Sequence, residues 1–428
     1  MTDSFTRRDF VKTAAAVGAA TALPAFAIGR PGRGADLRVG VIGCGGRGTG
    51  AAVDALTADP GVRIVAMADL FPDRLAGSLR GIKGHDEGAY ADRVDVPQSR
   101  QYVGFDAYQQ LLADAEVDYV ILATPPGFRP LHFEAAINAG HHVFMEKPVA
   151  VDPAGVRRVI AAAAVADQKK LSVVTGTQRR HEDCYLAAME QIKDGAIGKV
   201  VSARAYWNQG GLWHHARKPE YSDMEAQCRN WLYYAWLSGD HICEQHIHNL
   251  DVINWVVGET PAKCMGMGGR EVRTGPEYGH IFDHFAVEYE YPSGAYMISM
   301  CRQIDGCASR VQEVVHGSDG TMHSSSGWAT IRSGNSEWKA PQNRRSPYVQ
   351  EHIDLIASIG GSASRLNEAK RTAESTLTAI MGRMSAYTGK EVTWEQAMNS
   401  ALDLSPDSYA FGPLPTPEVA VPGRTPLI

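Results

Sequence analysis

Residues 37–48 read LRVGVIGCGGRG, a short apolar run followed at once by a glycine-rich turn. Gly43, Gly45 and Gly48 have the spacing of the turn that joins the first strand of a dinucleotide-binding sheet to its helix. Glycine lets the backbone turn tightly and approach a pyrophosphate, and the helix N-terminus that follows offers free N–H groups to the phosphates. The stretch therefore predicts a doubly wound α/β domain that binds a dinucleotide.

An acidic residue at the end of the next expected strand indicates which dinucleotide is bound. Residues 62–69 read VRIVAMAD, and Asp69 ends the strand 21 residues after Gly48. A carboxylate there accepts hydrogen bonds from the ribose 2′-hydroxyl and repels a 2′-phosphate, which favours NAD over NADP. Arg74 stands close by in the sequence and keeps NADP open as the second choice. The predicted cofactor contacts are Gly43, Gly45, Gly46, Arg47, Gly48, Asp69, Thr124, Pro125, Glu146 and Lys147.

Strands and helices are expected to alternate through the first part of the chain, the pattern of a parallel sheet. The expected strands are residues 36–42, 62–69, 118–124 and 141–145. Later segments are rich in β-type runs and predict a second α/β domain with a large, open, mostly antiparallel sheet. We expect a signal and linker over 1–34, an NAD-binding Rossmann domain over 35–150, a substrate-binding and oligomerisation domain over 151–403, and a proline-rich tail over 404–428.

Composition narrows the class of protein. The chain has 428 residues, 44% of them hydrophobic, and a net charge of −6, which gives no electrostatic reason to expect nucleic acid as a partner. Its seven cysteines are an odd number without a CxxC pair, so no disulfide framework is indicated. These features suit a two-domain globular enzyme.

The first residues have the pattern of an export signal. Arg7 and Arg8 precede a weakly apolar, alanine-rich stretch over residues 13–23, and an Ala-Phe-Ala sequence allows cleavage after Ala27. This resembles a twin-arginine signal, which predicts a periplasmic or other extracytoplasmic location. A stable membrane span is not expected, because it would need about 20 predominantly apolar residues. Since free NAD is not expected outside the cytoplasm, we predict a cofactor that stays tightly bound and is recycled on the protein.

Glu146-Lys147-Pro148 follows the fourth expected strand, at the edge of the sheet where ligands lie. With this motif, nearly all of the chain after the signal resembles the Gfo/Idh/MocA oxidoreductases. The resemblance rests on the Gly43 turn with Asp69, on residues 123–126 (ATPP), 146–150 (EKPVA) and 239–255. It implies a homodimer or homotetramer, and a lysine, here Lys147, that contacts the reacting hydroxyl and the nicotinamide region.

The same family carries a helix with an acid, a histidine and a second acid, the first two at the substrate. The matching residues are Glu244, His248 and Asp251, with Glu244 where the family usually has Asp. Oxidising a secondary alcohol needs a base for the hydroxyl proton, and histidine is suited to that near neutral pH. A lysine at the oxygen stabilises the developing alkoxide. We therefore predict Lys147 and His248 as central catalytic residues, with Glu244 assisting from the same helix face.

Aromatic and polar side chains gather before the expected Glu244 helix, as suits a carbohydrate that packs on rings and bonds through its hydroxyls. Further candidates are Gln178, Arg180, His181, Trp231, Tyr233, Tyr234 and Trp236. Cys243, Glu244 and His246 are metal-ligand types, but no second cluster completes a set, and no metal is predicted. The predicted substrate contacts are Arg179, Tyr206, Trp207, Trp213, His214 and His246.

Together these features predict an exported NAD(P)-dependent oxidoreductase that takes hydride from a secondary hydroxyl of a sugar, glycoside or cyclitol. Two alternatives stay open. One is redox-neutral glycoside hydrolysis by oxidation, elimination and re-reduction, which some members of the resembled family perform. The other is a non-catalytic sugar-binding protein with a structural NAD.

Overall fold

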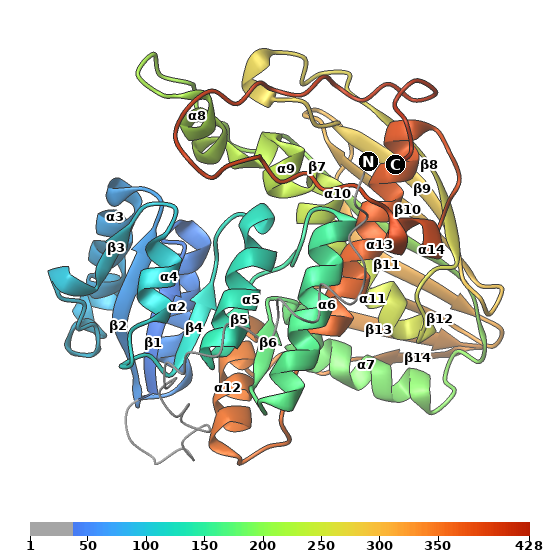
Figure 1. Cartoon of the computed structure of the whole chain (residues 1–428). Helices are drawn as coiled ribbons and strands as arrows, with labels where there is room; N and C mark the ends of the chain where they lie inside the picture. The colour runs from blue at the N-terminus through green and yellow to red at the C-terminus, as the bar shows by residue number, and fades with distance from the viewer. Residues whose placement is uncertain (1–36) are drawn as a thin grey trace, which may run out of the picture. The chain divides into compact units, whose positions relative to one another are not determined.

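Two sheets organise residues 37–428, the part of the chain described in a computed structural model (Figure 1). The expected signal and its cleavage point at Ala27 lie outside the described residues. No helix within the described residues is long and apolar enough to cross a bilayer.

The first sheet has six parallel strands in the order β3-β2-β1-β4-β5-β6. Its strands are almost wholly apolar and buried, as expected for a sheet covered on both faces. The order of strands reverses between β1 and β4, which creates the crevice where doubly wound sheets bind ligands. The strands are β1 (Leu37–Ile42), β2 (Val62–Asp69), β3 (Gln101–Val103), β4 (Tyr119–Leu122), β5 (His142–Met145) and β6 (Val173–Thr175). The helices between them are α2 (Gly46–Ala58), α3 (Pro72–Lys83), α4 (Ala107–Leu112), α5 (Arg129–Ala139) and α6 (Pro153–Gln168).

The first sheet continues beyond residue 150, where the NAD-binding domain was expected to end. Strand β6 lies beyond it and pairs in parallel with β5, because its buried apolar residues cover an edge that would otherwise stay open. Helix α12 (Pro347–Gly360), from late in the chain, packs against α2 and β6. The half of the molecule that carries the first sheet is therefore built from both sides of the expected boundary.

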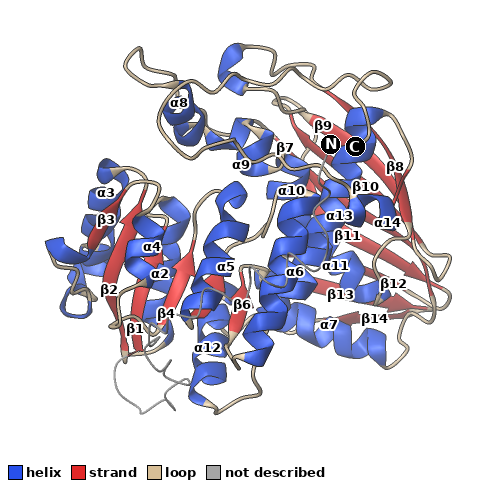
Figure 2. Ribbon diagram, viewed as in Figure 1, coloured by secondary structure: helices blue, strands red, loops and turns tan. Residues whose placement is uncertain are grey.

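The second sheet has nine strands in the order β14-β13-β12-β11-β7-β10-β9-β8-β15, and Figure 2 shows them as the larger red array. Only the β7–β10 pair is parallel among its described strands, which confirms the mostly antiparallel prediction. Burial alternates along β9, so one face of the sheet is covered. The strands are β7 (Val200–Gln209), β8 (Lys263–Gly269), β9 (His284–Glu290), β10 (Tyr296–Gln303), β11 (Arg310–Gly317), β12 (Thr321–Ser325), β13 (Trp328–Ser333), β14 (Ser336–Lys339) and β15 (Val392–Thr393).

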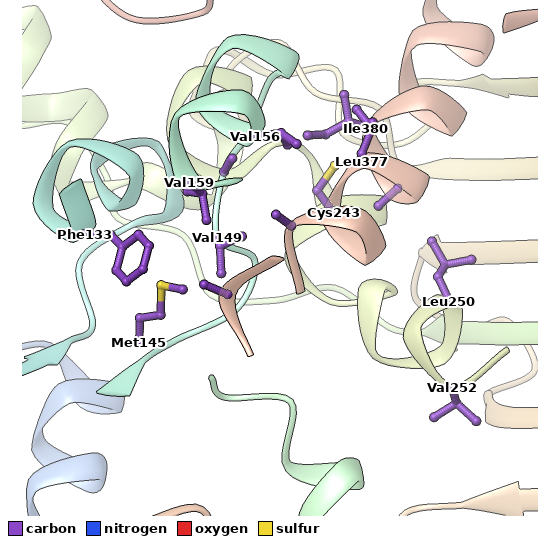
Figure 3. Close-up of a cluster of buried hydrophobic side chains, with 14 of the residues drawn as sticks. Phe133, Met145, Val149, Val156, Val159, Cys243, Leu250, Val252, Leu377 and Ile380 are labelled. Carbon is purple, nitrogen blue, oxygen red and sulfur yellow. The ribbon is translucent and has the colours of Figure 1, made fainter. Parts of the chain in front are cut away.

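Helices pack on this sheet and connect it to the first one. Helix α13 (Ala369–Thr388) contacts β8 and also α6, which flanks the first sheet. One buried apolar cluster runs through these elements, and Figure 3 shows Val156 and Val159 of α6 beside Leu377 and Ile380 of α13. This shared core holds the two sheets in a fixed relation around the cleft between them. The remaining helices are α7 (Asp183–Lys193), α8 (Asp223–Arg229), α9 (Ala235–Ser238), α10 (His241–Glu244), α11 (Ile247–Val257) and α14 (Trp394–Asn399).

The single helix expected to carry Glu244 and His248 is two helices. Helix α10 ends at Glu244, and α11 begins at Ile247. Gln245, between them, has φ −113° and ψ −51°, and its N–H bonds the His241 carbonyl before the chain turns into α11. The two side chains therefore reach the cleft from adjoining helices and not from one helix face.

Candidate active site

A cleft of about 720 Å³ lies where the carboxyl ends of the first sheet meet the second domain. Its walls come from the glycine turn, the ends of β2, β4 and β5, and the segments around β7, α8 and α10. Its volume is within the range of sites that hold small molecules, and its position is the switch point of the sheet.

The glycine turn is shaped for a phosphate group. Gly43 has φ +98°, and a Cβ at Gly43 or Gly48 would collide with neighbouring backbone. At Gly45 and Gly46, by contrast, a Cβ would meet nothing within 4 Å, so the backbone there is open to the cleft. Helix α2 begins at Gly46 and directs its free N–H groups the same way. These residues fit the pyrophosphate of a dinucleotide.

Asp69 is held at the end of β2 with both carboxylate oxygens engaged. One oxygen accepts from the Cys44 N–H at 2.6 Å and the other from the Phe71 N–H at 2.8 Å. Burial raises the pKa of Asp69, and the two backbone hydrogen bonds oppose that shift. Each oxygen keeps a free lone pair, and Asp69 lines the cleft together with Arg74. The carboxylate is therefore placed to accept hydrogen bonds from a ribose.

Arg47 and Glu146 line the cleft but are bonded chiefly to each other. Arg47 Nε donates to Glu146 Oε1 at 2.5 Å, Arg47 Nη2 lies 3.1 Å from Asp54, and its guanidinium covers the Tyr348 ring at 4.9 Å. Glu146 directly precedes Lys147. The pair therefore fixes the glycine turn relative to the segment that carries the lysine.

Arg129 secures the other side of that segment and was not foreseen from the sequence. It is buried and donates to the carbonyls of Thr124 and Pro148. Burial lowers its pKa to about 10. Thr124 Oγ1 also bonds His132 Nδ1 at 3.2 Å. Both predicted strand-end residues, Thr124 and Pro125, line the cleft.

Lys147 extends from the first domain to the second. Its Nζ donates to the Glu244 carbonyl oxygen and lies 3.2 Å from Glu244 Oε1. Both side chains are mostly buried, at 12% and 16% exposure, and both line the cleft. The ammonium charge at this point is therefore balanced by a carboxylate.

His248 faces the same cleft from α11. Its ring stacks on Trp207 with centroids 5.6 Å apart and accepts or donates no hydrogen bond within residues 37–428. Burial, and then the charges of Lys147 and Arg179, lower its pKa well below 6.5. His248 is therefore a neutral imidazole near pH 7, with a ring nitrogen able to accept a proton.

The six predicted substrate contacts divide into two groups. Trp207 and Trp213 line the cleft. Tyr206 does not, because neighbouring residues of β7 point to opposite faces, and it packs under Arg310 at 4.8 Å. The other three are also outside the cleft lining: Arg179 pairs with Glu313 at 2.5 Å, His214 lies exposed beside Tyr278, and His246 bonds Ser299 at 2.8 Å.

Asp251, the third residue of the resembled motif, supports the fold. It forms a two-point ion pair with Arg180, at 2.7 and 2.9 Å, and accepts from Ser375 at 2.7 Å. Burial of this pair ties α11 to α13 and to the turn after β6. Within residues 37–428 no group of three or more His, Cys, Asp or Glu side chains converges as a metal site.

Several lining residues were not predicted as contacts. Of the further candidates, Gln178 and Trp231 line the cleft, whereas Arg180, His181, Tyr233, Tyr234 and Trp236 are outside its lining. The unforeseen ones belong to segments whose positions depend on tertiary packing, and no local motif marks them. Among them are Phe71, His132, His215, Arg229, Gln245 and Tyr348.

Comparisons with known proteins agree with this architecture. Residues 37–175 match the model of an oxidoreductase family with an NAD-binding Rossmann fold, and residues 185–323 match the Gfo/Idh/MocA C-terminal domain. Residues 4–24 match the signal sequence of the twin-arginine translocation pathway, which directs export across the cytoplasmic membrane.

Named relatives are distant. A 2,7-anhydro-N-acetylneuraminate hydratase of Escherichia coli is 28% identical over 47% of this chain and 50% of its own length. An inositol 2-dehydrogenase of Salmonella paratyphi B is 27% identical over 52% of this chain and 55% of its own length, so the chain spans about half the length of these curated relatives. A levoglucosan dehydrogenase solved with NADH and levoglucosan shares the fold, with a TM-score of 0.66 at 16% identity over 84% of this chain and 99% of that one. By its two matched domains and the cleft between them, the chain belongs to the Gfo/Idh/MocA family of NAD-binding oxidoreductases.

Proposed function

We propose that this chain is an exported oxidoreductase that transfers hydride from a secondary hydroxyl of a sugar, glycoside or cyclitol to tightly bound NAD. The observation that carries the proposal is the meeting of Lys147 and His248 in one cleft with the glycine turn. A proton acceptor and a cationic donor beside a dinucleotide cradle are the groups that alcohol oxidation requires.

The roles of the side chains follow from their contacts. NAD, when bound, supplies the acceptor for the hydride that leaves the alcohol carbon. Lys147 Nζ donates a hydrogen bond to the alcohol oxygen and stabilises negative charge as it develops there. The neutral ring of His248 takes the hydroxyl proton, so that oxygen and carbon become a carbonyl. Glu244 holds the lysine in place by accepting its hydrogen bonds.

The lining of the cleft suits a neutral polyol. The charge of Lys147 is balanced by Glu244, and three indole rings, Trp207, Trp213 and Trp231, stand in the lining. Aromatic faces pack against the C–H surfaces of sugars, while amide groups bond the hydroxyls. The relatives named for inositol and levoglucosan act on or bind compounds of this kind.

Side chains from α8 and from the C-terminal tail cover the end of the cleft near Asp69. This cover supports retention of the cofactor. Arg229 of α8 lies over the Phe71 ring at 3.9 Å and reaches Asp73 at 3.2 Å, so a segment of the second domain spans the loop after β2. Phe411 of the C-terminal tail stacks on Phe71, with ring centroids 6.0 Å apart, and contacts Phe105 in a tilted arrangement at 5.1 Å. A dinucleotide lying beside Asp69 would be enclosed by these groups.

Replacing Arg229 with Ala should therefore loosen the cofactor. We expect NAD to dissociate about 10-fold faster, since a cation–π contact and an ion pair are lost together. The measurement is the ratio of NAD to protein at intervals after dilution. Arg332→Ala, which removes an exposed arginine of β13, is the matched control and should match wild type. Equal loss rates for the two variants would remove this support for retention.

Asp69→Ala should weaken NAD more than NADP. Loss of hydrogen bonds to the ribose hydroxyl should raise the Kd for NAD about 10-fold, whereas removal of a negative charge favours a 2′-phosphate beside Arg74. Because Asp69 also holds the Cys44 N–H, both cofactors lose some affinity, and the ratio of their Kd values is the quantity to compare. Asp92→Ala, an exposed position, is the control. An unchanged ratio would contradict the ribose role.

A redox-neutral reaction is the second candidate. Oxidation of a sugar hydroxyl to a carbonyl would acidify the neighbouring C–H and permit elimination of the aglycone. After water adds, the same hydride, kept on a retained NAD, would return to the carbonyl, so that the glycoside is hydrolysed without net oxidation. One relative is named as a hydratase of an anhydro sugar, a reaction without net oxidation. The cover formed by Arg229 and Phe411 suits this cycle as well as the first.

One experiment separates the two candidates. Purified protein is incubated without added NAD with D-glucose, myo-inositol, levoglucosan and aryl glycosides, and cofactor absorbance and product masses are followed. Reduced bound cofactor together with a keto sugar supports the oxidoreductase. Release of the aglycone without net cofactor reduction supports the redox-neutral reaction. An oxidised cofactor and unchanged sugars throughout would contradict both.

A further inference from the structure

Gln245 stands in the connection between α10 and α11, and its amide oxygen is fully engaged inside the second domain. Gln245 Oε1 accepts from Gln209 Nε2 at 2.9 Å and from Gln303 Nε2 at 2.5 Å. Both donors lie at the ends of neighbouring strands, β7 and β10, so the amide is clamped from two sides.

The direction of these hydrogen bonds is fixed by the ends of the network. The Trp207 indole N–H donates to Gln209 Oε1 at 2.9 Å, and the Arg273 guanidinium donates to Gln303 Oε1. Neither an indole N–H nor a guanidinium can accept a hydrogen bond. Each flanking glutamine must therefore turn its oxygen outward and its NH₂ group toward Gln245. This settles an amide orientation that the shape of the side chain alone would leave open.

It follows that Gln245 presents only donors to the cleft. Its oxygen is used by two amides, and within residues 37–428 no group accepts from its Nε2. Gln245 lines the cleft beside Glu244, whose carbonyl receives Lys147. Trp207, which anchors one end of the network, is also the ring on which His248 stacks. The network that positions the donor therefore includes Trp207, the side chain on which the proposed base stacks.

We propose that Gln245 is a specificity-determining residue that donates a hydrogen bond to an oxygen of a neutral polyol bound between Trp207 and Lys147. The inference rests on the proposed function. A substrate with a hydroxyl or ring oxygen at that point pairs with the amide, whereas a methylene would leave a buried donor unpaired and an ammonium would oppose it.

The test uses the full-length protein with its cofactor and two substitutions. In Gln245→Glu the carboxylate still accepts from Gln209 and Gln303 but offers an acceptor to the cleft. In Gln245→Met both the network and the donor are lost. Gln312→Glu, the same change on β11 outside the cleft lining, is the control. Affinities for D-glucose, myo-inositol and levoglucosan are read from tryptophan fluorescence, and cofactor reduction is recorded in parallel with the melting temperature.

We expect Gln245→Glu to keep the wild-type melting temperature and cofactor content while the Kd of the bound sugar rises about 10-fold or more. Gln245→Met should show a similar loss of affinity with some loss of stability, and KM should rise more than kcat falls. If Gln245→Glu oxidised sugar with an unchanged KM, the inference would be overturned and the proposed function would stand. If the wild-type protein bound sugar more tightly than both Gln245 variants but never reduced its cofactor, the inference would be supported and the proposed function contradicted.

Discussion

Replacing Lys147 with Met is expected to abolish cofactor reduction by sugars while leaving the cofactor bound. The lysine contributes the cationic donor at the alcohol oxygen, and loss of one such donor costs on the order of 10³-fold in rate. Its Nζ contacts Glu244, so the substitution leaves the glycine turn and Asp69 untouched. The measurement is single-turnover absorbance of the bound cofactor together with its quantity per protein.

Lys339→Met is the matched control, because Lys339 is an exposed residue of β14. It should behave as wild type in both measurements. If Lys147→Met turned over sugars at the rate of this control, the catalytic assignment would fail. If neither protein oxidised any sugar yet both bound sugar and NAD equally, the non-catalytic sugar-binding alternative would be favoured.

Replacing His248 with Asn is expected to lower the rate of cofactor reduction by about 10²- to 10⁴-fold, the range for removal of a general base. In the wild-type protein, the rate of cofactor reduction should also fall at acid pH, as His248 becomes protonated. The base works only when deprotonated, and burial with the nearby Lys147 and Arg179 charges lowers its pKa. Activity should therefore persist as pH falls through 6.5, the ordinary histidine value, and decline only below it.

The measurement is the pH profile of single-turnover cofactor reduction for wild type and His248→Asn. His316→Asn, at the end of β11 and outside the cleft lining, should retain the wild-type profile. A wild-type acid limb centred above pH 6.5 would contradict the assignment of a buried, neutral His248. An unchanged rate in His248→Asn would remove the residue from the mechanism.

Local sequence predicted the glycine turn and the strands beside it, although it did not mark Arg129 or the packing of α12 against α2. The glycine turn and Asp69 act through backbone geometry that neighbouring residues dictate, and the expected strands match β1 and β2 closely. Lys147 follows a strand whose end must lie at the ligand edge of a parallel sheet. Such positions are determined by short-range patterns and by sheet topology together.

The substrate half depended on packing that no local pattern encodes. Tyr206 and Trp207 are adjacent aromatic residues, and both were predicted to contact substrate. Because neighbouring residues of β7 point to opposite faces, only Trp207 lines the cleft. His246 was an attractive polar candidate, yet the break between α10 and α11 turns it inward to Ser299. The amide of Gln245 is held by partners 36 and 58 residues away, which no local pattern indicates.

Following the transferred hydrogen tests the proposed hydride transfer from sugar to NAD. The purified protein is incubated with fully C-deuterated D-glucose, myo-inositol or levoglucosan, and the bound cofactor is released and weighed by mass spectrometry. We predict reduced cofactor carrying one deuterium in wild type and none in Lys147→Met. If the cofactor bound to the wild-type protein stayed oxidised and free of deuterium with all three compounds, hydride transfer from these sugars to NAD would be ruled out.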